Sequence, residues 1–563
     1  MSIYRERLSH DPWAPNNKSI RYRDLNFIDC YHKILSSEID IPSADYDKAI
    51  EEKAELLSSL MGRYLAEQHG DALDFSYLLR PFYYFYLFVY ANGSYIKPAG
   101  TSSGDSFQPF PNLNKLSGLL PDSRAHEILY NLSRTEDPLR DALNVLEEIP
   151  RYQKTTGTVS TEDRDEEDIE PHVGMSLSLV VAEKLILWLM SGRTLRFVKA
   201  RRPDQDHPPT MDPALRSRLL VAISNDTGIR QLPGEDYRLL LSSVLFMPPY
   251  FLEDFAHELA AARELSRGLS ALICGIEFQH KPQVAIALAL LKKRGSRLIG
   301  SQHGGAYGQT DMTLMERSER FLFDDYITWG YRFYANDHPL PSIRLSRFRL
   351  APLWQKFRHR LVKPEAKTIL VVLPNISFAL ACGAHHPNLL QQHEALLRSL
   401  EILLPAINDD YKIVLRMHPW NVDQDYEMAI PDFMRGHASL VHGKRGTLAR
   451  DMHHFEFVMF PSPYATGLSE CIVNGVPFTI ISTPEFSRIR PEAEPVYRAL
   501  READVWVTEA EQLARVLGAK KINDRQKTAL EQFGRMYAFH SYAYLGYWSR
   551  FIDGLRSKRT WEV

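Results

Sequence analysis

The sequence lacks several features that mark particular classes of protein. Its 563 residues include four cysteines, which are widely scattered and form neither a CxxC pair nor a metal-like spacing. We therefore expect a reducing compartment and no disulfide scaffold. The net charge of −3 gives no reason to expect nucleic-acid binding. The first residues carry no apolar signal-peptide core, so we expect a cytoplasmic location.

Long hydrophobic runs are also missing. The two most apolar stretches, residues 78–90 and 177–190, are interrupted by proline or charge, and both are shorter than the roughly 20 residues of a membrane span. We interpret both as buried helices. The aromatic-rich first stretch, and the basic run at residues 193–202, leave open a peripheral contact with the inner face of a membrane.

What is present indicates more than one domain. The length exceeds that of one ordinary core, and the 44% hydrophobic and 24% charged content is that of a globular protein. From Leu219 onward short apolar runs alternate with helical patterns, the apolar run at residues 239–247 among them, which predicts β/α units and parallel sheets. The ranges that we assign are an N-terminal helical region at 1–150, an acidic mobile segment at 151–173, a first β/α domain at 174–343, a linker at 344–366, a second β/α domain at 367–524, and one long helical tail at 525–563.

The stretch SQHGGAYG, residues 301–308, follows a strand-like run. Glycines in its His-Gly-Gly turn permit a positive φ and let backbone N–H groups approach a ligand closely. His303 can donate, accept or carry charge near neutral pH. Ligands of parallel sheets bind beyond the carboxyl ends of the strands, so we expect Glu277, after the strand-like run SALICGI, on the same rim. A structural histidine in a terminating turn is the alternative.

Two turns in the second half are informative. In RMHPW, residues 416–420, His418 stands after a strand-like run and Pro419 fixes the turn; a hydrogen-bonding group there can hold a phosphate. In FPSPYATGLSECIVNGVP, residues 460–477, a Ser/Thr/Gly turn precedes a helix whose N-terminus favours phosphate or carboxylate, while Glu470 can receive ribose hydroxyls. A ligand-free His-Pro turn and an ordinary capped helix are the alternatives.

These motifs resemble those of bacterial GT-B glycosyltransferases. His418 with Pro419, and the turn at residues 462–466, are similar to the paired motifs by which transferases of CMP-activated sialic acid, Kdo and related sugars hold CMP. The blocks LAEQHGDALDFSYLLRPF, SQHGGAYG, MERSER and DDYITWGY are similar to those of a group of bacterial surface-sugar transferases. That group carries an acidic residue where this chain has QHKPQ at residues 279–283, so Glu277 is the nearest carboxylate.

The resemblance implies an α/β, GT-B-like fold, in which two Rossmann-like domains face a cleft, with an N-terminal helical extension and a C-terminal helical tail. It implies transfer of Kdo or another nonulosonic acid from a CMP-sugar to a glycan or glycolipid acceptor, with no cofactor. The residues that it implies for donor binding are His418, Pro419, Arg416, Ser462, Thr466, Gly467 and Glu470. Those for catalysis are His303, Glu277 and Glu316, and those for acceptor binding are Gln302, Gly304, Gly305, Tyr307 and Glu319. A solvated helix face is the alternative for Glu316 and Glu319.

We expect no metal dependence. DxD strings occur at residues 163–165, 204–206 and 423–425, and only the third, just after the His-Pro turn, merits a test. A transferase of polyol phosphate from a CDP-linked donor and a non-catalytic carbohydrate-binding assembly factor are the alternatives for function. A nucleotide-sugar epimerase fits the long helical region less well. The sugar, the acceptor, the stereochemical outcome and the oligomeric state stay open.

Overall fold

The structure is a computed structural model. It describes residues 44–70, 73–95, 128, 131–132, 134–148, 172–177, 179, 181–198, 211–310, 314–350, 365–373, 399, 402–403, 406–407, 411–417, 438–442, 447–482, 489–519 and 522–557.

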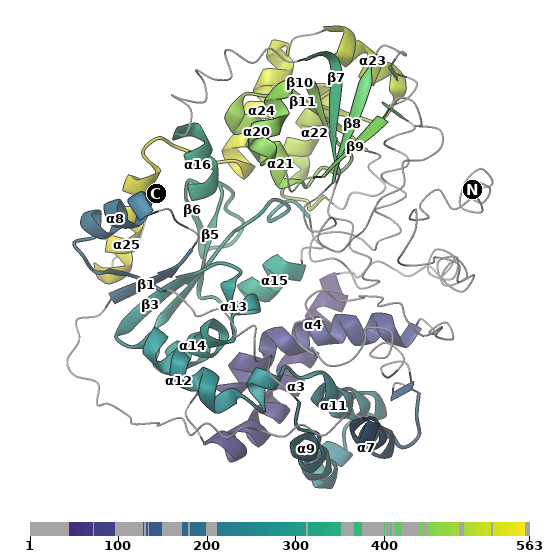
Figure 1. The fold of residues 1–563 in the computed structure, drawn as a ribbon, viewed down its shortest axis with the longest axis vertical. Coiled ribbons are helices and arrows are strands. Elements are labelled where there is room, and N and C mark those ends of the chain that lie inside the picture. The colour runs from purple at the N-terminus through teal and green to yellow at the C-terminus, as the bar shows by residue number, and fades with distance from the viewer. Residues whose placement is uncertain are drawn as a thin grey trace.

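The N-terminal part forms a helical layer under the first sheet (Figure 1, purple to blue). It consists of α3 (Ala44–His69), α4 (Phe75–Tyr95), α7 (Pro138–Glu148), α9 (Pro213–Asn225), α10 (Thr227–Arg230) and α11 (Gly234–Phe246), with η1 (Pro249–Phe251) leading to α12 (Phe255–Ser266).

The β/α pattern expected from Leu219 is therefore wrong for the apolar run at residues 239–247, which is helical, whereas α12 agrees with its helical part. The apolar run at residues 239–247 lies almost entirely in α11, and its side chains are buried in the core of this layer. Tyr83 and Tyr86 of α4 hydrogen-bond to Ser243 and Ser242 of α11 at 2.8 and 2.6 Å. A helix buried on all sides is apolar all round, which removes the periodicity that identifies it in a sequence.

The first sheet has six parallel strands in the order β2-β1-β3-β4-β5-β6. The strands are β1 (His172–Ser176), β2 (Leu195–Phe197), β3 (Leu269–Cys274), β4 (Arg297–Ser301), β5 (Asp325–Thr328) and β6 (Asp337–Pro339), with α8 (Val181–Met190), α13 (Glu277–His280), α14 (Pro282–Lys293) and α15 (Leu314–Arg320) between them. His172 and Val173 belong to β1, so the mobile segment expected at 151–173 is wrong for these two residues. Residues 151–171 lie outside the described part.

The second sheet is also six-stranded and parallel, in the order β12-β11-β10-β7-β8-β9. Its strands are β7 (Glu365–Val372), β8 (Lys412–Met417), β9 (Ala438–His442), β10 (Phe455–Phe460), β11 (Phe478–Ile481) and β12 (Trp506–Val507), and its helices are α20 (Leu448–Asp451), η4 (Met452–His454), α21 (Thr466–Asn474), α22 (Glu494–Glu502) and α23 (Ala510–Ala519). The expected linker begins as a helix, α16 (Ile343–Leu350), which packs against α21.

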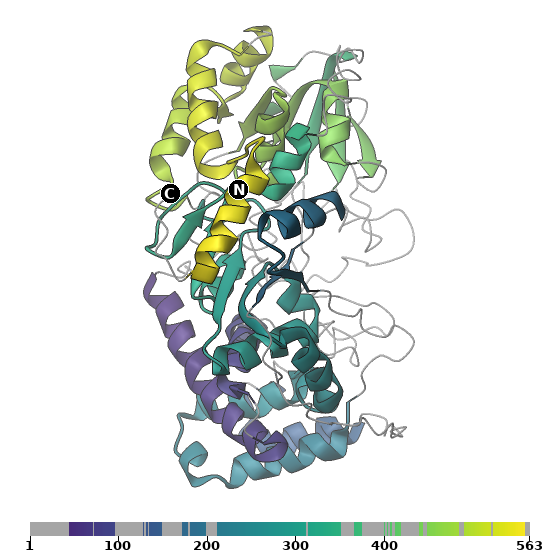
Figure 2. The same cartoon turned by 90° about the vertical axis from the view of Figure 1, so that its left-hand side faces the viewer.

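The tail is two helices rather than the single long helix expected. α24 (Asp524–Tyr537) packs on the second domain, and α25 (Tyr544–Ser557) crosses to the first (Figures 1 and 2). Tyr544, Trp548 and Phe551 of α25 lie in one core with β1, β3, β4 and β5. Two parallel α/β sheets joined by a tail that returns to the first domain confirm the expected GT-B-like fold. No helix in the described part of the chain is long and apolar enough to cross a membrane.

The two apolar stretches differ in their environment. α4 is buried, as expected, through residues such as Leu79 and Tyr83. We expected α8 to be a buried helix as well, and this is wrong, because one face of α8 is exposed and apolar.

Candidate active site

Gln302 fixes the start of the turn that follows β4. Its backbone N–H donates to the Ile327 carbonyl at 2.9 Å, its side-chain oxygen accepts from Trp329 N at 2.8 Å, and its side-chain nitrogen donates to the Gly304 carbonyl at 2.8 Å. The side chain is buried. Gln302, a predicted acceptor-binding residue, thus attaches the turn to β5.

Gly305 acts through close approach rather than through φ. Positive φ occurs at Ala306 (71°) and Gly308 (68°) and not at Gly304 or Gly305, so that part of the prediction is wrong. A Cβ on Gly305 would lie 2.7 Å from Thr466 N and 2.7 Å from the Tyr464 carbonyl oxygen. Gly305 N donates to Thr466 Oγ1 at 2.8 Å. The turn therefore touches the N-terminus of α21 in the second domain.

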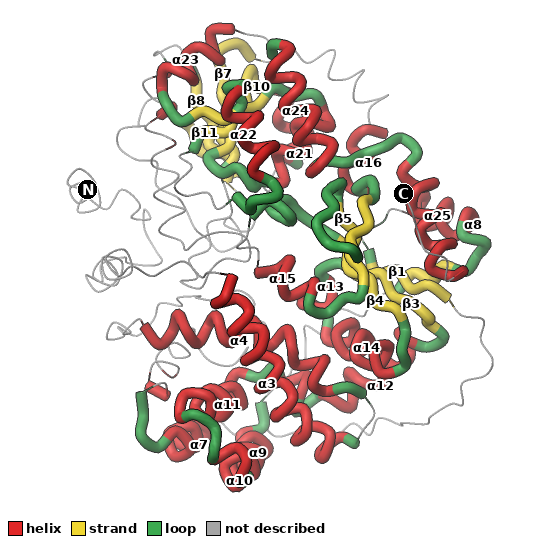
Figure 3. The backbone as a smooth tube through the Cα atoms, turned by 180° about the vertical axis from the view of Figure 1, so that it is seen from behind, coloured by secondary structure: helices red, strands yellow, loops and turns green. Residues whose placement is uncertain are grey.

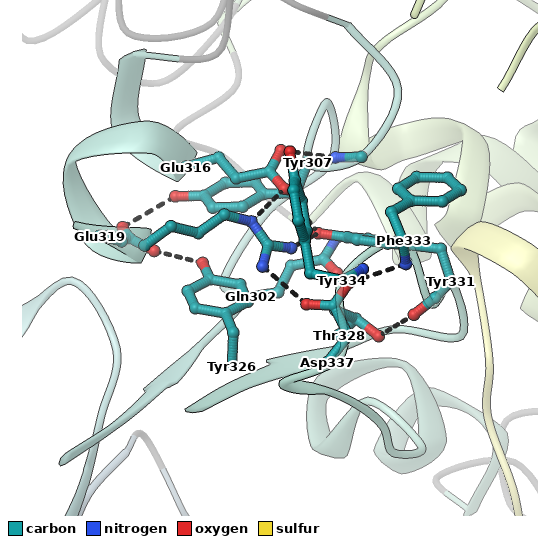
Figure 4. A network of polar contacts seen from close by, with 12 residues as sticks. Gln302, Tyr307, Glu316, Glu319, Tyr326, Thr328, Tyr331, Phe333, Tyr334 and Asp337 are labelled. Carbon is teal, nitrogen blue, oxygen red and sulfur yellow. Dashed lines mark hydrogen bonds and ion pairs between the residues drawn. The ribbon is translucent and has the colours of Figure 1, made fainter. Parts of the chain in front are cut away.

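His303 lies at the exposed end of a buried polar cluster (Figure 4 shows its inner part). The Tyr307 hydroxyl lies 3.1 Å from His303 Nδ1 and 3.2 Å from Nε2, and it donates to Glu319 Oε1 at 2.9 Å. His303 Nδ1 is 3.5 Å from Glu319 Oε1, and the Tyr326 hydroxyl also donates to Glu319. The side chain of His303 is 24% exposed and that of Glu319 1%. Glu319 thus supports His303 from within the domain and does not reach the surface.

The electrostatics of Glu319 are unusual. Burial raises the pKa of Glu319 to about 8, and the neighbouring Glu316 carboxyl adds to this rise. Hydrogen bonds from Tyr326 and Tyr307 act in the opposite direction. A carboxyl that changes charge slightly above neutral pH next to a histidine is a typical feature of a functional site.

Glu316 is held behind the turn. It accepts hydrogen bonds from Gly308 N at 2.7 Å, from Arg320 Nε at 2.9 Å and from the Tyr331 hydroxyl at 3.2 Å. Arg320 also donates to Asp337 at 2.6 Å (Figure 4). The carboxylate is buried, and these three hydrogen-bond partners lie in the first domain, so in this conformation it orders the turn.

Glu277 lies at the same sheet edge as His303. It begins α13 directly after β3, and β3 pairs with β4 through Cys274 and Gly300. Its Oε2 accepts from Gly275 N at 3.1 Å, and burial raises its pKa. The structure thus brings Glu277 and His303 to the carboxyl ends of neighbouring strands.

On the second domain the predicted turn precedes α21. Thr466 is half-buried at the start of that helix and its hydroxyl accepts from Gly305. Ser462 accepts from Tyr464 N at 3.4 Å. A Cβ on Gly467 would come within 2.6 Å of the Phe460 ring and 2.7 Å of Leu448, so Gly467 lets α21 pack closely on β10.

Two predicted donor residues are buried and engaged in ion pairs with more exposed partners. Glu470 accepts from Arg344 Nη2 at 2.6 Å, which joins α21 to α16; burial raises its pKa and Arg344 counters this. Arg416, at the end of β8, is buried and pairs with Asp451. His418 and Pro419, and all three DxD strings, lie outside the described residues.

The family model of the LIC12162 family transferases matches residues 152–551. The chain belongs to the LIC12162 family of transferases. No curated protein matches the sequence.

Several solved structures share a remote likeness with this LIC12162 family transferase. S. aureus MnaA, in a co-structure with UDP, is 8% identical with a TM-score of 0.36 and covers 70% of this chain and 99% of its own. Acinetobacter baumannii MurG is 12% identical with a TM-score of 0.32, over 68% and 99%. A variant of the Thermobaculum terrenum O-GlcNAc transferase is 12% identical with a TM-score of 0.33, over 92% and 100%. These scores are too low to carry an argument.

In this LIC12162 family transferase further residues, not predicted from the sequence, join the turn to the second domain. The Tyr537 hydroxyl donates to the Gly308 carbonyl at 3.0 Å, and the Tyr497 hydroxyl donates to Gln309 Oε1 at 2.7 Å. Thr310 forms an isolated antiparallel bridge with Ile489. The partners are about 180 or more residues apart in sequence and follow no periodic pattern, so no local signal identifies them.

Two arginines, one from each domain, border this contact. Arg490 N donates to the Gln309 carbonyl at 3.1 Å, and its side chain donates to the Tyr334 hydroxyl at 3.2 Å and pairs with Glu492 at 3.0 Å. Burial lowers the pKa of Arg317 in α15, and the nearby charge of Arg490 adds to this. In the LIC12162 family transferase two arginines, one of them paired with Glu492, thus lie within electrostatic range of each other near this contact.

Proposed function

We propose that this transferase is a glycosyltransferase that moves an acid sugar, Kdo or another nonulosonic acid, from a CMP-sugar to a bacterial surface glycan or glycolipid. The observation that carries the proposal is His303, partly exposed and backed by Glu319, where the first domain meets the N-terminus of α21. The CMP part of the proposal is supported by the sequence motifs around His418 and residues 462–466.

The cluster supports His303 as the general base. The Tyr307 hydroxyl donates to Glu319, so its oxygen can accept a ring N–H of His303, which leaves the other ring nitrogen as an acceptor. That nitrogen takes the proton of the acceptor hydroxyl while the hydroxyl oxygen bonds to the anomeric carbon. The bond from the anomeric carbon to the phosphate oxygen breaks, and CMP leaves with the bonding electrons.

The leaving phosphate and the sugar carboxylate both need positive charge. The N-terminus of α21 supplies partial positive charge for the phosphate without a metal. Arg317 and Arg490 beside the turn supply charge for the carboxylate of an acid sugar.

The central experiment measures CMP release from CMP-Kdo, CMP-sialic acid and CMP-pseudaminic acid with a panel of acceptors. His303→Gln should lower kcat about 100-fold or more with a smaller change in KM. His257→Gln, at an exposed position of α12, is the matched control and should retain full activity. Transfer of polyol phosphate from a CDP-linked donor, without turnover of any CMP-sugar, would contradict the proposed donor and favour the polyol phosphate transferase. Full activity of His303→Gln would show that His303 is not the general base.

The donor side is tested separately by calorimetric titration with CMP. His418→Ala should weaken CMP binding about tenfold or more, because a hydrogen bond to a charged phosphate is lost. His454→Ala changes an exposed histidine of the same domain and should leave the affinity unchanged. Equal CMP affinity in the two variants would contradict the assignment of the phosphate to His418.

A further inference from the structure

The outer face of α8 is apolar and exposed. Its exposed residues recur four and five positions apart, so they form one stripe along the helix. They are Val181, Leu185, Ile186, Leu189 and Met190, exposed by 83%, 54%, 41%, 53% and 46%. We call these five residues the α8 stripe. In Figures 1 and 3 the helix lies beside α25 at the outside of the first domain.

The opposite face of α8 is firmly attached to the protein. Leu187 is fully buried in the core that contains Tyr544 and Trp548 of α25. Glu183, also buried, accepts from Arg347 Nη2 at 2.6 Å and from the Tyr544 hydroxyl at 2.7 Å. The helix therefore has an inverted pattern, with its acid inside and its aliphatic side chains outside. Rotation to bury the α8 stripe would expose Glu183 and break its ion pair.

Two cations flank the α8 stripe. The guanidinium of Arg193 lies 5.2 Å from the ring centroid of Trp188, and the Lys184 ammonium lies 5.7 Å from that of Phe197. Arg193 is exposed and Lys184 half-buried. Glu183 is the one acid in α8, and it faces inward. An exposed apolar stripe flanked by cations is typical of a helix that lies in the interface of an anionic bilayer.

The size of the α8 stripe also favours a lipid surface over a protein partner. A helix of 10 residues is about 15 Å long and about 10 Å wide. Its face thus covers about 150 Å², far below the roughly 800 Å² that each partner contributes to a stable protein interface. Shallow insertion into lipid needs only a few apolar side chains.

We propose that α8 docks the protein onto an anionic lipid bilayer. The α8 stripe enters the boundary between headgroups and acyl chains, and Lys184 and Arg193 contact lipid phosphates. This binding is independent of the identity of the sugar donor and is measured without turnover.

The test is sedimentation of the full chain with vesicles of phosphatidylethanolamine and phosphatidylglycerol. Leu185→Glu combined with Leu189→Glu should weaken binding about tenfold or more, because two apolar groups are replaced by repelled charges. The matched control combines Leu56→Glu and Val221→Glu, at side chains of α3 and α9 that are 41% and 42% exposed. Both double variants replace exposed side chains, and equal thermal melting shows that they fold.

A second arm tests the charges. Lys184→Gln combined with Arg193→Gln should weaken binding to the anionic vesicles about fivefold per residue and reduce its salt dependence. Vesicles of phosphatidylcholine alone should bind the protein weakly. Equal binding of all variants, or no binding of the unaltered protein, would overturn the proposal. The protein could instead self-associate without binding vesicles, and Leu185→Glu combined with Leu189→Glu could abolish that self-association. This result would show that the α8 stripe binds a second copy of the chain and not a bilayer.

Discussion

Glu319 is a carboxyl of the candidate site that changes charge slightly above neutral pH. Its carboxyl is fully buried next to that of Glu316, and the two tyrosine hydroxyls that donate to it only partly offset the cost of ionisation. The folded protein therefore holds a proton on Glu319 that the unfolded chain releases above its ordinary pKa of 4.5. The free energy of unfolding, and the charge of the Glu319 carboxyl next to His303, therefore both depend on pH.

Glu319→Gln should remove part of the pH dependence of stability. The folded pKa of about 8 lies above the unfolded value, so the favourable contribution is complete below about pH 4.5 and is lost as pH rises through 8. The free energy of unfolding should fall by up to about 1.4 kcal/mol per pH unit over this window. Glutamine does not titrate, so the fall in the free energy of unfolding between pH 6 and pH 9, measured by urea unfolding, should be smaller in the variant than in the unaltered protein.

Glu264→Gln provides the matched control for this measurement. Glu264 is a glutamate whose side chain is 71% exposed, and its replacement should retain the slope of the unaltered protein. An unchanged slope in Glu319→Gln would show that Glu319 is ionised in the folded protein at neutral pH.

At the scale of elements, α25 stands out because it belongs to the tail yet completes the core of the first domain. Trp548 is buried, and its indole N–H donates to the Pro341 carbonyl at 2.9 Å. The preceding segment is attached as well, since Phe539 N donates to the Trp329 carbonyl and Ser342 N donates to the Phe539 carbonyl. The tail therefore connects the second domain to the first.

Trp548→Ala should lower the free energy of unfolding by about 3–5 kcal/mol, because it opens a large cavity in a buried core. Tyr542→Ala, at a side chain of the same tail that is 57% exposed, should change it by less than about 0.5 kcal/mol. Both are measured by urea unfolding. A cost below about 1 kcal/mol for Trp548→Ala would mean that α25 contributes little to the first domain.

The elements that the sequence predicts well are those with clear local boundaries. β3, β4, β10 and β11 are short apolar runs next to polar, glycine or proline positions, so a local pattern is enough to indicate them. The buried α11 lacks periodicity, and the break between α24 and α25 contains neither glycine nor proline. The apolar pattern of α8 predicts a helix but not which side faces water, because that depends on Arg347 and α25.

The same limit applies to the site. The turn at His303 and the start of α21 are local motifs, and both were predicted. Their direct contact through Gly305 and Thr466, and the inward orientation of Glu316 and Glu319, depend on partners brought in by the fold. Roles that depend on such distant partners cannot be read from a short motif.

For the whole molecule, the main consequence is that the two domains meet through the turn itself. Gly305, Gly308 and Gln309 hydrogen-bond to Thr466, Tyr537 and Tyr497 of the second domain. A displacement of the second domain thus moves the groups next to His303. Catalysis and the relative position of the domains should therefore respond together to a change at this contact.

Gly305→Ala tests this coupling. The new Cβ would lie 2.7 Å from two backbone atoms of the second domain, Thr466 N and the Tyr464 carbonyl oxygen, which cannot be relieved by a side-chain rotation. The domains must separate locally, at a cost of about 1–3 kcal/mol. We expect a lower melting temperature, a larger radius of gyration by small-angle X-ray scattering and loss of transferase turnover.

Gly518→Ala provides the control. A Cβ at Gly518 in α23 meets nothing within 4 Å, and it should stabilise the helix by up to about 1 kcal/mol. If Gly305→Ala left the radius of gyration and the turnover at the values of Gly518→Ala, the turn would not set the position of the second domain, and His303 would act independently of it.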